Sequence, residues 1–249
     1  MKDVLILVLL FVLYSCEKTN GEVIEYDING KVISKSFIKD KNNFDSIYFF
    51  KDGLIFRKVI FNEYNKNYII KNYDKDQHLI SEGPAIDSIK IGIWHFYNIK
   101  NEIVKKVEFK KICSSEYPNQ EYTYQENRKI NISKSSFYQY SLKEIFHDSR
   151  KYYNININYV PLLKNKSSTV LFFSTEIDKD FCNVDSIRKD TVPSSGSPFN
   201  FLFNVAFKTK GNKNVRGYIS EYYYEDTSNK KFVEIQERRV FFDIPIVSK

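Results

Sequence analysis

The stretch "SIYFFKDGLIFRKVIF" (46–61) places an aromatic run before Asp-Gly and an aliphatic run after it. Asp-Gly between two apolar runs is a strong signal for a tight β-hairpin turn. A second stretch, "WHFYNIKNEIVKKVEF" (94–109), aligns with the first without a gap. Identical residues stand opposite Ile55, Lys58, Val59 and Phe61. The match indicates an internal repeat whose unit is a hairpin.

Further copies extend the series in both directions. Tyr73 lies 24 residues after Phe49 and 24 before Tyr97. The aromatic anchors of the copies are Tyr26, Phe49, Tyr73, Tyr97 and Tyr124. An aliphatic residue follows each anchor six positions later, as Val32, Ile55, Leu79, Ile103 and Ile130. An aromatic strand, a turn and an aliphatic strand therefore recur about five times along the first half of the chain.

Turn-forming pairs separate each anchor from its aliphatic partner. They are Asn29-Gly30, Asp52-Gly53, Asp76-Gln77, Lys100-Asn101 and Asn127-Arg128. A single two-stranded hairpin is only marginally stable in water, so neighbouring hairpins must pair to complete a sheet. We expect residues 22–140 to form a long antiparallel meander of about five hairpins.

This unit resembles the MORN-type hairpin repeat of bacterial exported proteins, whose pattern is roughly Gly-x-Trp-x-x-Tyr-x-x-x-Gly. In "EGPAIDSIKIGIWHFYN" (82–98), Gly92, Trp94 and Tyr97 fit the pattern. The closing glycine is Asn101 in this copy, and the first two copies keep it as Gly30 and Gly53. The resemblance covers roughly residues 22–140 and implies a scaffold, some members of which are antitoxin-like.

From about Lys151 the repeat is lost and longer β-rich segments follow, such as "KYYNININYVPLL" and "KFVEIQERRVFFDIPIV". Apolar residues alternate at Tyr153, Ile155 and Ile157, as in a strand with one buried face. We expect residues 151–249 to form an antiparallel β-sandwich of immunoglobulin-like type. Pro245 in the last strand argues for an edge position or a bulge.

One segment has the pattern of a helix. In "SLKEIFHDSR" (141–150), Leu142, Ile145 and Phe146 share one helical face. Ser141 could cap this helix together with Glu144 three residues later. The sequence therefore predicts a short helical connector over residues 141–150, in a chain that is otherwise all-β.

The N-terminus has the pattern of an export signal. Lys2 precedes an unbroken apolar run from Val4 to Leu13, which is shorter than the roughly 18–20 residues of a membrane-spanning helix. "LYSC" (13–16) resembles the lipobox of bacterial lipoproteins. The resemblance implies a lipoprotein signal peptide over residues 1–15, lipidation such as palmitoylation at Cys16, and a tether over 16–21. An ordinary signal peptide or an N-terminal anchor helix is the alternative.

The net charge and the export signal limit the classes of binding partner that we expect. The formal net charge is +7, which can indicate nucleic acid or anionic lipid. For an exported, lipid-anchored protein nucleic acid is an unsuitable partner, and lysines on solvated strands also protect sheet edges. The lipid bilayer, inner or outer, is the expected partner through Cys16, together with an envelope protein or glycan.

Motifs for chemistry are few. The histidines make no metal-binding pair, and no nucleotide or other cofactor motif occurs, so we expect no cofactor and no catalytic or metal site. "DKDFCNVD" (178–185) clusters oxygen ligands that could hold calcium, but it lacks the glycine and terminal glutamate of an EF-hand loop, so a solvated acidic loop is the favoured interpretation. Cys113 and Cys182 could pair in an oxidising envelope, but two separate thiols is the default expectation.

Aromatic side chains remain as the functional signal, because a single-layer sheet cannot bury both faces. The candidate binding surface is Trp94, Tyr97, Tyr222, Tyr223 and Tyr224. Such rings either meet a partner or cover one another across strands. Trp94 is expected to point inward with Phe96, and the alternative is a surface anchor. We expect a membrane-anchored binding module; the alternatives are an envelope hydrolase using acidic residues and an immunity-type protein.

Overall fold

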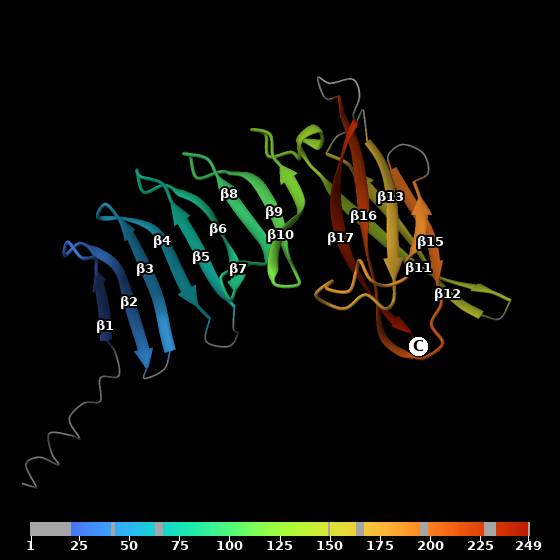
Figure 1. Cartoon of the computed structure of the whole chain (residues 1–249), viewed down its shortest axis with the longest axis horizontal. Coiled ribbons are helices and arrows are strands. Elements are labelled where there is room, and N and C mark those ends of the chain that lie inside the picture. Colours follow the sequence, from blue (N-terminus) through green and yellow to red (C-terminus); the bar gives the residue numbers. More distant parts are fainter. Residues whose placement is uncertain are drawn as a thin grey trace, which may run out of the picture. The chain divides into compact units, whose positions relative to one another are not determined.

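The structure is a computed structural model that describes residues 21–40, 43–62, 67–148, 150–162, 167–194, 199–226 and 233–248 (Figure 1). The predicted signal peptide, Cys16 and the tether up to residue 20 lie outside these ranges. The described chain is all-β, with one short 3-10 turn at Ile132–Lys134. No helix among the described residues is long and apolar enough to cross a membrane.

The first half of the chain forms one antiparallel sheet whose strands follow one another in chain order (Figure 1). The strands are β1 (Gly21–Tyr26), β2 (Val32–Asp40), β3 (Asn43–Lys51), β4 (Leu54–Phe61), β5 (Tyr68–Tyr73), β6 (Leu79–Ile86), β7 (Ile89–Lys90), β8 (Gly92–Tyr97), β9 (Ile103–Ile112) and β10 (Ser115–Thr123). Their order is β1-β2-β3-β4-β5-β6-β8-β9-β10, and β7 pairs with β6. We call this sheet the repeat sheet.

The chain divides into two compact units, which are described separately below. The first unit holds β1 to β6 together with residues 97–102. The second holds residues 89–96 and the chain from residue 103 onward. The last part of the repeat sheet thus belongs to the same unit as the C-terminal sheets.

The turns occur where the sequence places them. The second residue of every predicted turn pair has a positive φ, at Gly30 (76°), Gly53 (79°), Gln77 (63°), Asn101 (60°) and Arg128 (62°). In three turns the side chain of the first residue, Asp27, Asp74 or Asn98, accepts hydrogen bonds from the backbone N–H groups two and four positions later. Short polar side chains that stabilise the left-handed turn explain why the period survives without glycine.

Three of the five aromatic anchors pair with their aliphatic partners, whereas Phe49 lies opposite Arg57 and its neighbour Phe50 opposite Ile55. Tyr26 lies opposite Val32, Tyr73 opposite Leu79, and Tyr124 opposite Ile130. The register shifts beside the anchor in three hairpins, at Glu25/Tyr26, Phe49/Phe50 and Asn72/Tyr73. A bulge beside the anchor in these three units adds twist to the strands.

The C-terminal part consists of two further antiparallel sheets. Their strands are β11 (Phe137–His147), β12 (Arg150–Val160), β13 (Ser167–Ser174), β14 (Asp190–Pro193), β15 (Phe199–Val205), β16 (Gly211–Asp226) and β17 (Val233–Ser248). The orders are β11-β12-β15 and β14-β13-β16-β17. Both sheets contribute to one hydrophobic core, in which Ile155, Ile157, Phe201, Ile219 and Phe242 are fully buried.

The helix predicted over residues 141–150 does not form. Residues 141–147 belong to β11, which pairs along its whole length with β12, from Phe137 opposite Val160 to His147 opposite Arg150. The expected apolar helical face is not buried, since Leu142 is 39% and Phe146 74% exposed. Pairing with the β-branched and aromatic strand β12 outweighs the local helical pattern.

The edge position inferred from Pro245 is confirmed. Pro245 lies in β17, the last strand of its sheet, which pairs with β16. Proline lacks the N–H that a strand between two neighbours would donate, so the edge tolerates it.

Candidate functional site

One face of the repeat sheet carries a row of lysine and aromatic side chains within the first unit. Lys35 lies opposite Tyr48, Tyr48 opposite Lys58, Lys58 opposite Lys71, and Lys71 opposite Glu82. Residues directly opposite in antiparallel strands point to the same face of the sheet. We call this set, together with Tyr97, which binds Glu82, the lysine–tyrosine face: Lys35, Tyr48, Lys58, Lys71, Glu82 and Tyr97.

Tyr97, a residue of the predicted binding surface, is held by a short polar chain. Its hydroxyl donates to Glu82 Oε1 at 2.6 Å, and Lys71 Nζ lies 2.9 Å from Glu82 Oε2. Burial, followed by the hydrogen bond and charge of Glu82, raises the pKa of Tyr97 to about 12. The hydrogen bond to Glu82 also raises the pKa of Lys71. Tyr97 is therefore a neutral hydroxyl fixed beside an ion pair.

Cations on this face lie against aromatic rings. Lys58 Nζ is 4.6 Å from the centre of the Tyr48 ring, and Lys35 Nζ is 5.0 Å from that of Phe37. The Phe37 and Tyr48 rings are themselves 5.1 Å apart. Lys35 also forms an ion pair with Glu22 at 2.8 Å. Cation–π contacts of this kind hold the ammonium groups close to the sheet.

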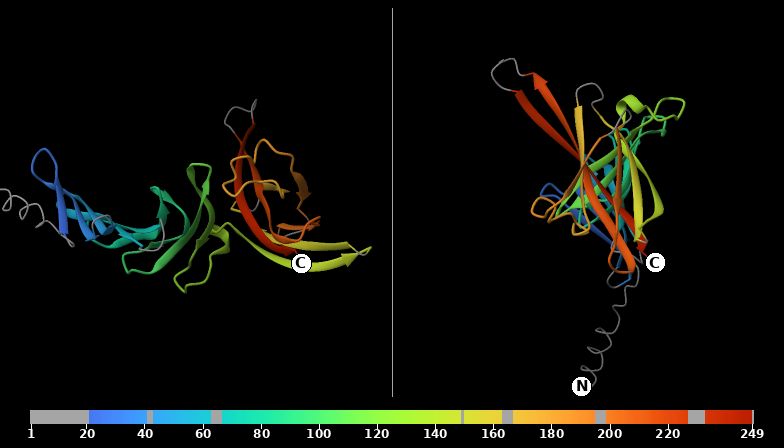
Figure 2. Two further views of the ribbon diagram at one scale, coloured as in Figure 1. Left: turned by 90° about the horizontal axis from the view of Figure 1, so that it is seen from below. Right: turned by 90° about the vertical axis from the view of Figure 1, so that its right-hand side faces the viewer.

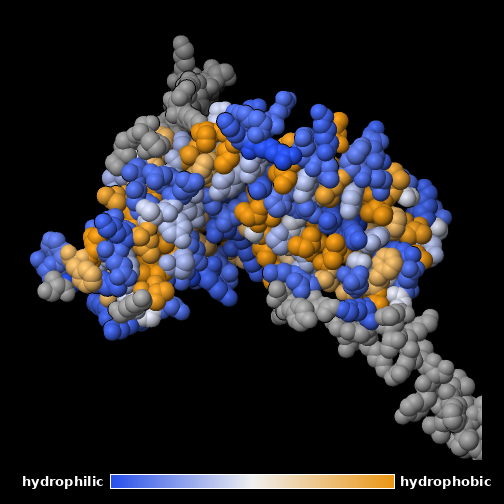
Figure 3. All heavy atoms as spheres, turned by 180° about the vertical axis from the view of Figure 1, so that it is seen from behind, coloured by the Kyte–Doolittle hydropathy of each residue, from blue (hydrophilic) through white to orange (hydrophobic). Residues whose placement is uncertain are grey.

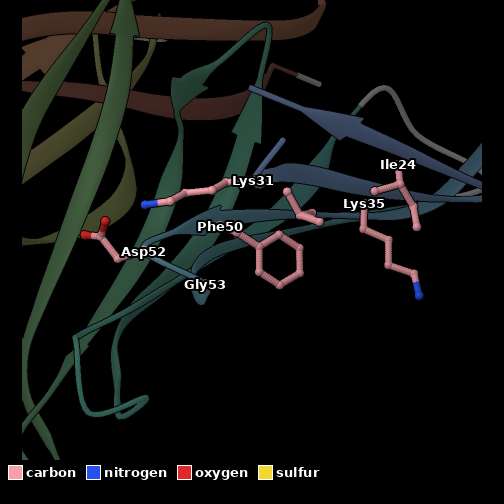
Figure 4. A pocket seen from close by; sticks show the side chains of 7 residues that line it. Ile24, Lys31, Lys35, Phe50, Asp52 and Gly53 are labelled. Carbon is pink, nitrogen blue, oxygen red and sulfur yellow. The ribbon is translucent and has the colours of Figure 1, made fainter. Parts of the chain in front are cut away.

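A shallow groove of about 540 Å³ lies at the turn end of the first two hairpins (Figure 4). Its lining comprises Ile24, Lys31, Val32, Lys35, Phe50, Asp52 and Gly53. Figure 4 shows the Phe50 ring and the Lys35 side chain on the same side of the ribbon. Lys35 therefore belongs both to the groove and to the lysine–tyrosine face, which makes the two features continuous.

Trp94 does not contribute to an exposed surface. Its side chain is 0% exposed, and its ring meets that of Phe109 edge-on at 6.0 Å. Lys90 Nζ lies 5.3 Å from the Trp94 ring centre. The place of Trp94 in the predicted binding surface is therefore wrong, and the inward packing expected for it agrees with its burial.

The tyrosines of β16 are only partly described. Tyr222 is half-buried and lies opposite Glu237. The backbones of Tyr223 and Tyr224 belong to β16, and their side chains lie outside the described part of the structure. The structure thus brings together Tyr97 with lysines that the sequence analysis did not select. Tyr97 belongs to the first unit and Tyr222 to the second.

Cys113 and Cys182 form a disulfide, so the expectation of separate thiols is wrong. Both cysteines belong to the second unit, because the hairpin β9–β10 is part of it. Cys113 lies in the β9–β10 turn, and its N–H donates to Asp180 O at 2.7 Å. A small apolar cluster lies next to the bridge and includes Ile177, Phe181, Val184, Tyr218 and Phe241.

The Asn119 side chain joins β10 to β17 with two hydrogen bonds, like those exchanged by the backbones of paired strands. Its side-chain amide donates to Phe241 O at 2.8 Å, and Phe241 N–H donates to Asn119 Oδ1 at 2.6 Å. Nearby, the Tyr117 hydroxyl donates to Arg239 O at 2.7 Å. These contacts cover the outer side of β17 with the last hairpin of the repeat sheet.

The acidic loop at 178–185 uses its oxygens internally. Asp178 Oδ1 accepts from the N–H groups of Asp180 and Cys182, and Asp178 Oδ2 accepts from that of Asn183. Asp185 forms an ion pair with Arg239 at 2.7 Å. These bonds agree with the interpretation as an acidic loop rather than with a calcium site.

A second group of possible metal ligands is Asp74, Asp76 and His78, whose ligand atoms lie within 4.8 Å of one another. Asp74 Oδ1 already accepts from the N–H groups of Asp76 and His78. The hydrogen bond from the His78 backbone is the main cause that lowers the pKa of Asp74. The group is therefore explained by the hairpin turn that it stabilises.

Apolar and hydrophilic side chains are interspersed on the molecular surface (Figure 3). Exposed large apolar side chains of the first unit include Ile33, Phe56 and Ile80, which are 43%, 39% and 43% exposed. These residues are equivalent in the repeat and lie next to the register shifts. The lysines at 35, 58 and 71 are likewise visible in the sequence, but only the strand register shows that they share a face.

Comparisons with known proteins identify no family. No family model matches the chain, and no curated protein matches it. One similar solved structure is a mutant of S. aureus TarM in complex with Fondaparinux, alpha-GlcNAc-glycerol and UDP, at 13% sequence identity and a TM-score of 0.28. The match covers 49% of this chain and 21% of that chain. At this TM-score the likeness says nothing about function.

Proposed function

We propose that this chain is a lipid-anchored envelope protein that acts as a binding module for a partner carrying acidic groups. The observation that carries this proposal is the lysine–tyrosine face. Three lysines and Tyr48 lie in one row across neighbouring strands, and Tyr97 joins this row through Glu82. Lys35 and Lys71 form ion pairs with Glu22 and Glu82, and their side chains are still 30% and 31% exposed. A cationic, partly aromatic surface suits a partner with acidic groups.

The proposed architecture is a meander of about five MORN-type hairpins followed by an immunoglobulin-like sandwich. The chain order of the repeat sheet and the common core of the two C-terminal sheets support it. In this arrangement the hairpins supply a broad surface, and the sandwich supplies a stable core.

Membrane attachment is proposed through Cys16. Fatty-acid labelling of cells that express the parent chain and Cys16→Ala tests it. We expect label in the parent and an unlabelled precursor in the variant. Labelling that survives the substitution would exclude Cys16 as the lipidated residue.

Binding is tested by affinity capture from solubilised envelope membranes. Lys58→Glu reverses a charge in the middle of the lysine–tyrosine face, and Lys179→Glu does the same at an exposed lysine outside it. Because like charges brought together at an interface cost several kcal/mol, we expect Lys58→Glu to recover at least about tenfold less partner than the parent. Lys179→Glu should recover as much as the parent. Equal capture by both variants, with unchanged melting temperatures, would overturn the proposal.

A further inference from the structure

The outward face of the sheet β11-β12-β15 carries an array of side-chain amides. Strand β12 reads "YNININY" over 153–159, and β15 contains "FNFLFN" over 199–204. The apolar members Ile155, Ile157 and Phe201 are fully buried in the core. Alternation along a strand therefore directs the asparagines to the opposite, outward face. We call this set the amide face: Gln139, Asn154, Asn156, Asn158, Asn200 and Asn204.

Strand register arranges the amide face in rows. Asn158 lies opposite Gln139 on one side and Asn200 on the other. Asn154 lies opposite Asn204, and its Nδ2 donates to Asn204 Oδ1 at 2.7 Å. Opposite side chains in a sheet stand about 5 Å apart, so the amides form a regular grid rather than a scatter. The bond between Asn154 and Asn204 orients part of this grid in advance.

The middle row adds an apolar platform. Asn156 lies between Ser141 and Leu202. Leu202 is 57% exposed although it belongs to a strand whose other face is the core. Asn156 Oδ1 is buried and has no hydrogen-bond partner in the part of the chain that the structure describes, so the exposed amides of the outer rows, such as that of Asn158, are the ones a ligand can reach. Carboxamides beside an exposed aliphatic side chain offer donors, acceptors and an apolar contact together.

The charge of this face is low. In the three rows, Lys143, which lies opposite Asn154 at the edge strand, is the charged residue. An amide group both donates and accepts without carrying charge, as the hydroxyls of a sugar do. A sugar ring also has an apolar C–H surface that can pack on Leu202. The chemistry of the face therefore matches a neutral, hydroxyl-rich ligand rather than an acidic one.

We propose that the amide face binds a neutral polysaccharide chain. Residues two apart on a strand are separated by about 6.8 Å, so three successive rows present amides over a length suited to an extended chain. The site lies in the second unit and shares no residue with the lysine–tyrosine face. It is therefore a binding site additional to the one in the proposed function, and either can fail without the other.

The test uses biolayer interferometry with the full chain in detergent and immobilised starch, xylan, galactomannan and mixed-linkage β-glucan. We expect saturable binding to at least one of these neutral polysaccharides. Because the double variant removes two side-chain amides that would hydrogen-bond the ligand, Asn154→Ala/Asn158→Ala should weaken binding by about tenfold. Asn212→Ala, at an exposed asparagine on β16 in the other sheet, should bind as the parent does.

Two outcomes overturn the inference. One is the absence of binding to all four polysaccharides, and the other is unchanged affinity in the double variant. Polygalacturonate serves as an acidic probe, and binding to it alone that Lys143→Gln abolishes would show a charged site instead. If the double variant has a lowered melting temperature, Asn158→Ala alone decides the matter, since the side chain of Asn158 is exposed.

Discussion

Trp94 is a large, fully buried side chain, so its removal should be costly to the stability of the fold. Its side chain is 0% exposed and contacts Phe109 and Lys90 within the second unit. Strand alternation predicts that Trp94 and Tyr97 lie on opposite faces, because their positions differ by an odd number. The large apolar area of tryptophan then predicts that the Trp94 face packs inward. The same reasoning cannot identify what covers the ring, since Phe109 comes from another strand.

We expect Trp94→Ala to destabilise the protein by about 3–5 kcal/mol, because deleting a buried aromatic side chain leaves a cavity. Chemical denaturation followed by circular dichroism measures this difference. Phe146→Ala is the matched control, since Phe146 is 74% exposed and its loss should change the free energy of unfolding by less than about 0.5 kcal/mol. Equal stability of the two variants would contradict the packing role of Trp94.

The raised pKa of Tyr97 predicts that the stability of the protein falls as the pH rises above 10. Its pKa rises from 10.0 to about 12 in the folded protein, through burial and then through Glu82. Its contribution to stability is complete below pH 10 and is lost as the pH rises through about 12. Melting temperatures across this interval should therefore fall less steeply for Tyr97→Phe than for the parent. Ultraviolet titration should show one late-ionising tyrosine fewer in the variant, and identical titration curves would contradict the bond to Glu82.

At the scale of elements, the hairpin turns determine the repeat. The turn pairs could be predicted from sequence because left-handed conformations favour Gly and Asn, and the remaining copies were found by their spacing. The structure adds the bulges beside the anchors, which no residue type marks. Strand β11 could not be predicted in this way. Its local sequence has a helical pattern, and it forms a strand because it pairs with β12. Local pattern thus predicts turns better than it predicts edge strands.

Arg128 occupies a turn position at an energetic cost. Its φ is 62°, a conformation that costs a side-chain-bearing residue about 1–2 kcal/mol. Arg128→Gly should therefore raise the free energy of unfolding by about 0.5–1 kcal/mol, after the entropy that glycine loses on folding. Differential scanning calorimetry measures the effect. Arg128→Ala keeps the strained conformation and should not stabilise, so stabilisation by both variants would indicate a different cause.

On the scale of the whole molecule, the last repeat hairpin joins the C-terminal sheets. The disulfide, Asn119 and Tyr117 all connect the hairpin β9–β10 to residues beyond position 180. Figure 2 shows the ribbon of this part from two further directions. Sequence reasoning placed the change of architecture near residues 141–150, because the repeat ends there. It could not detect the junction, since the contacts of Asn119 and Tyr117 span 122 residues of sequence.

Removing the disulfide should weaken this junction. The bridge closes a loop of 69 residues, and a cross-link of that length contributes about 4 kcal/mol through the entropy of the unfolded chain. We expect Cys113→Ser/Cys182→Ser to lower the melting temperature, and reductant to lower that of the parent alike. Reductant should leave the double variant unchanged. A parent that is insensitive to reductant under unfolding conditions would contradict the bridge.

The central claim is that the lysine–tyrosine face meets a partner in the envelope. Site-specific photo-crosslinking in intact cells tests it most directly, with the photoreactive residue placed at Tyr48 in the row or at Lys179 outside it. We predict that Tyr48 yields one discrete crosslinked species, that Lys58→Glu removes it, and that Lys179 does not yield it. Absence of a product at Tyr48, or the same product at both positions, would contradict the claim.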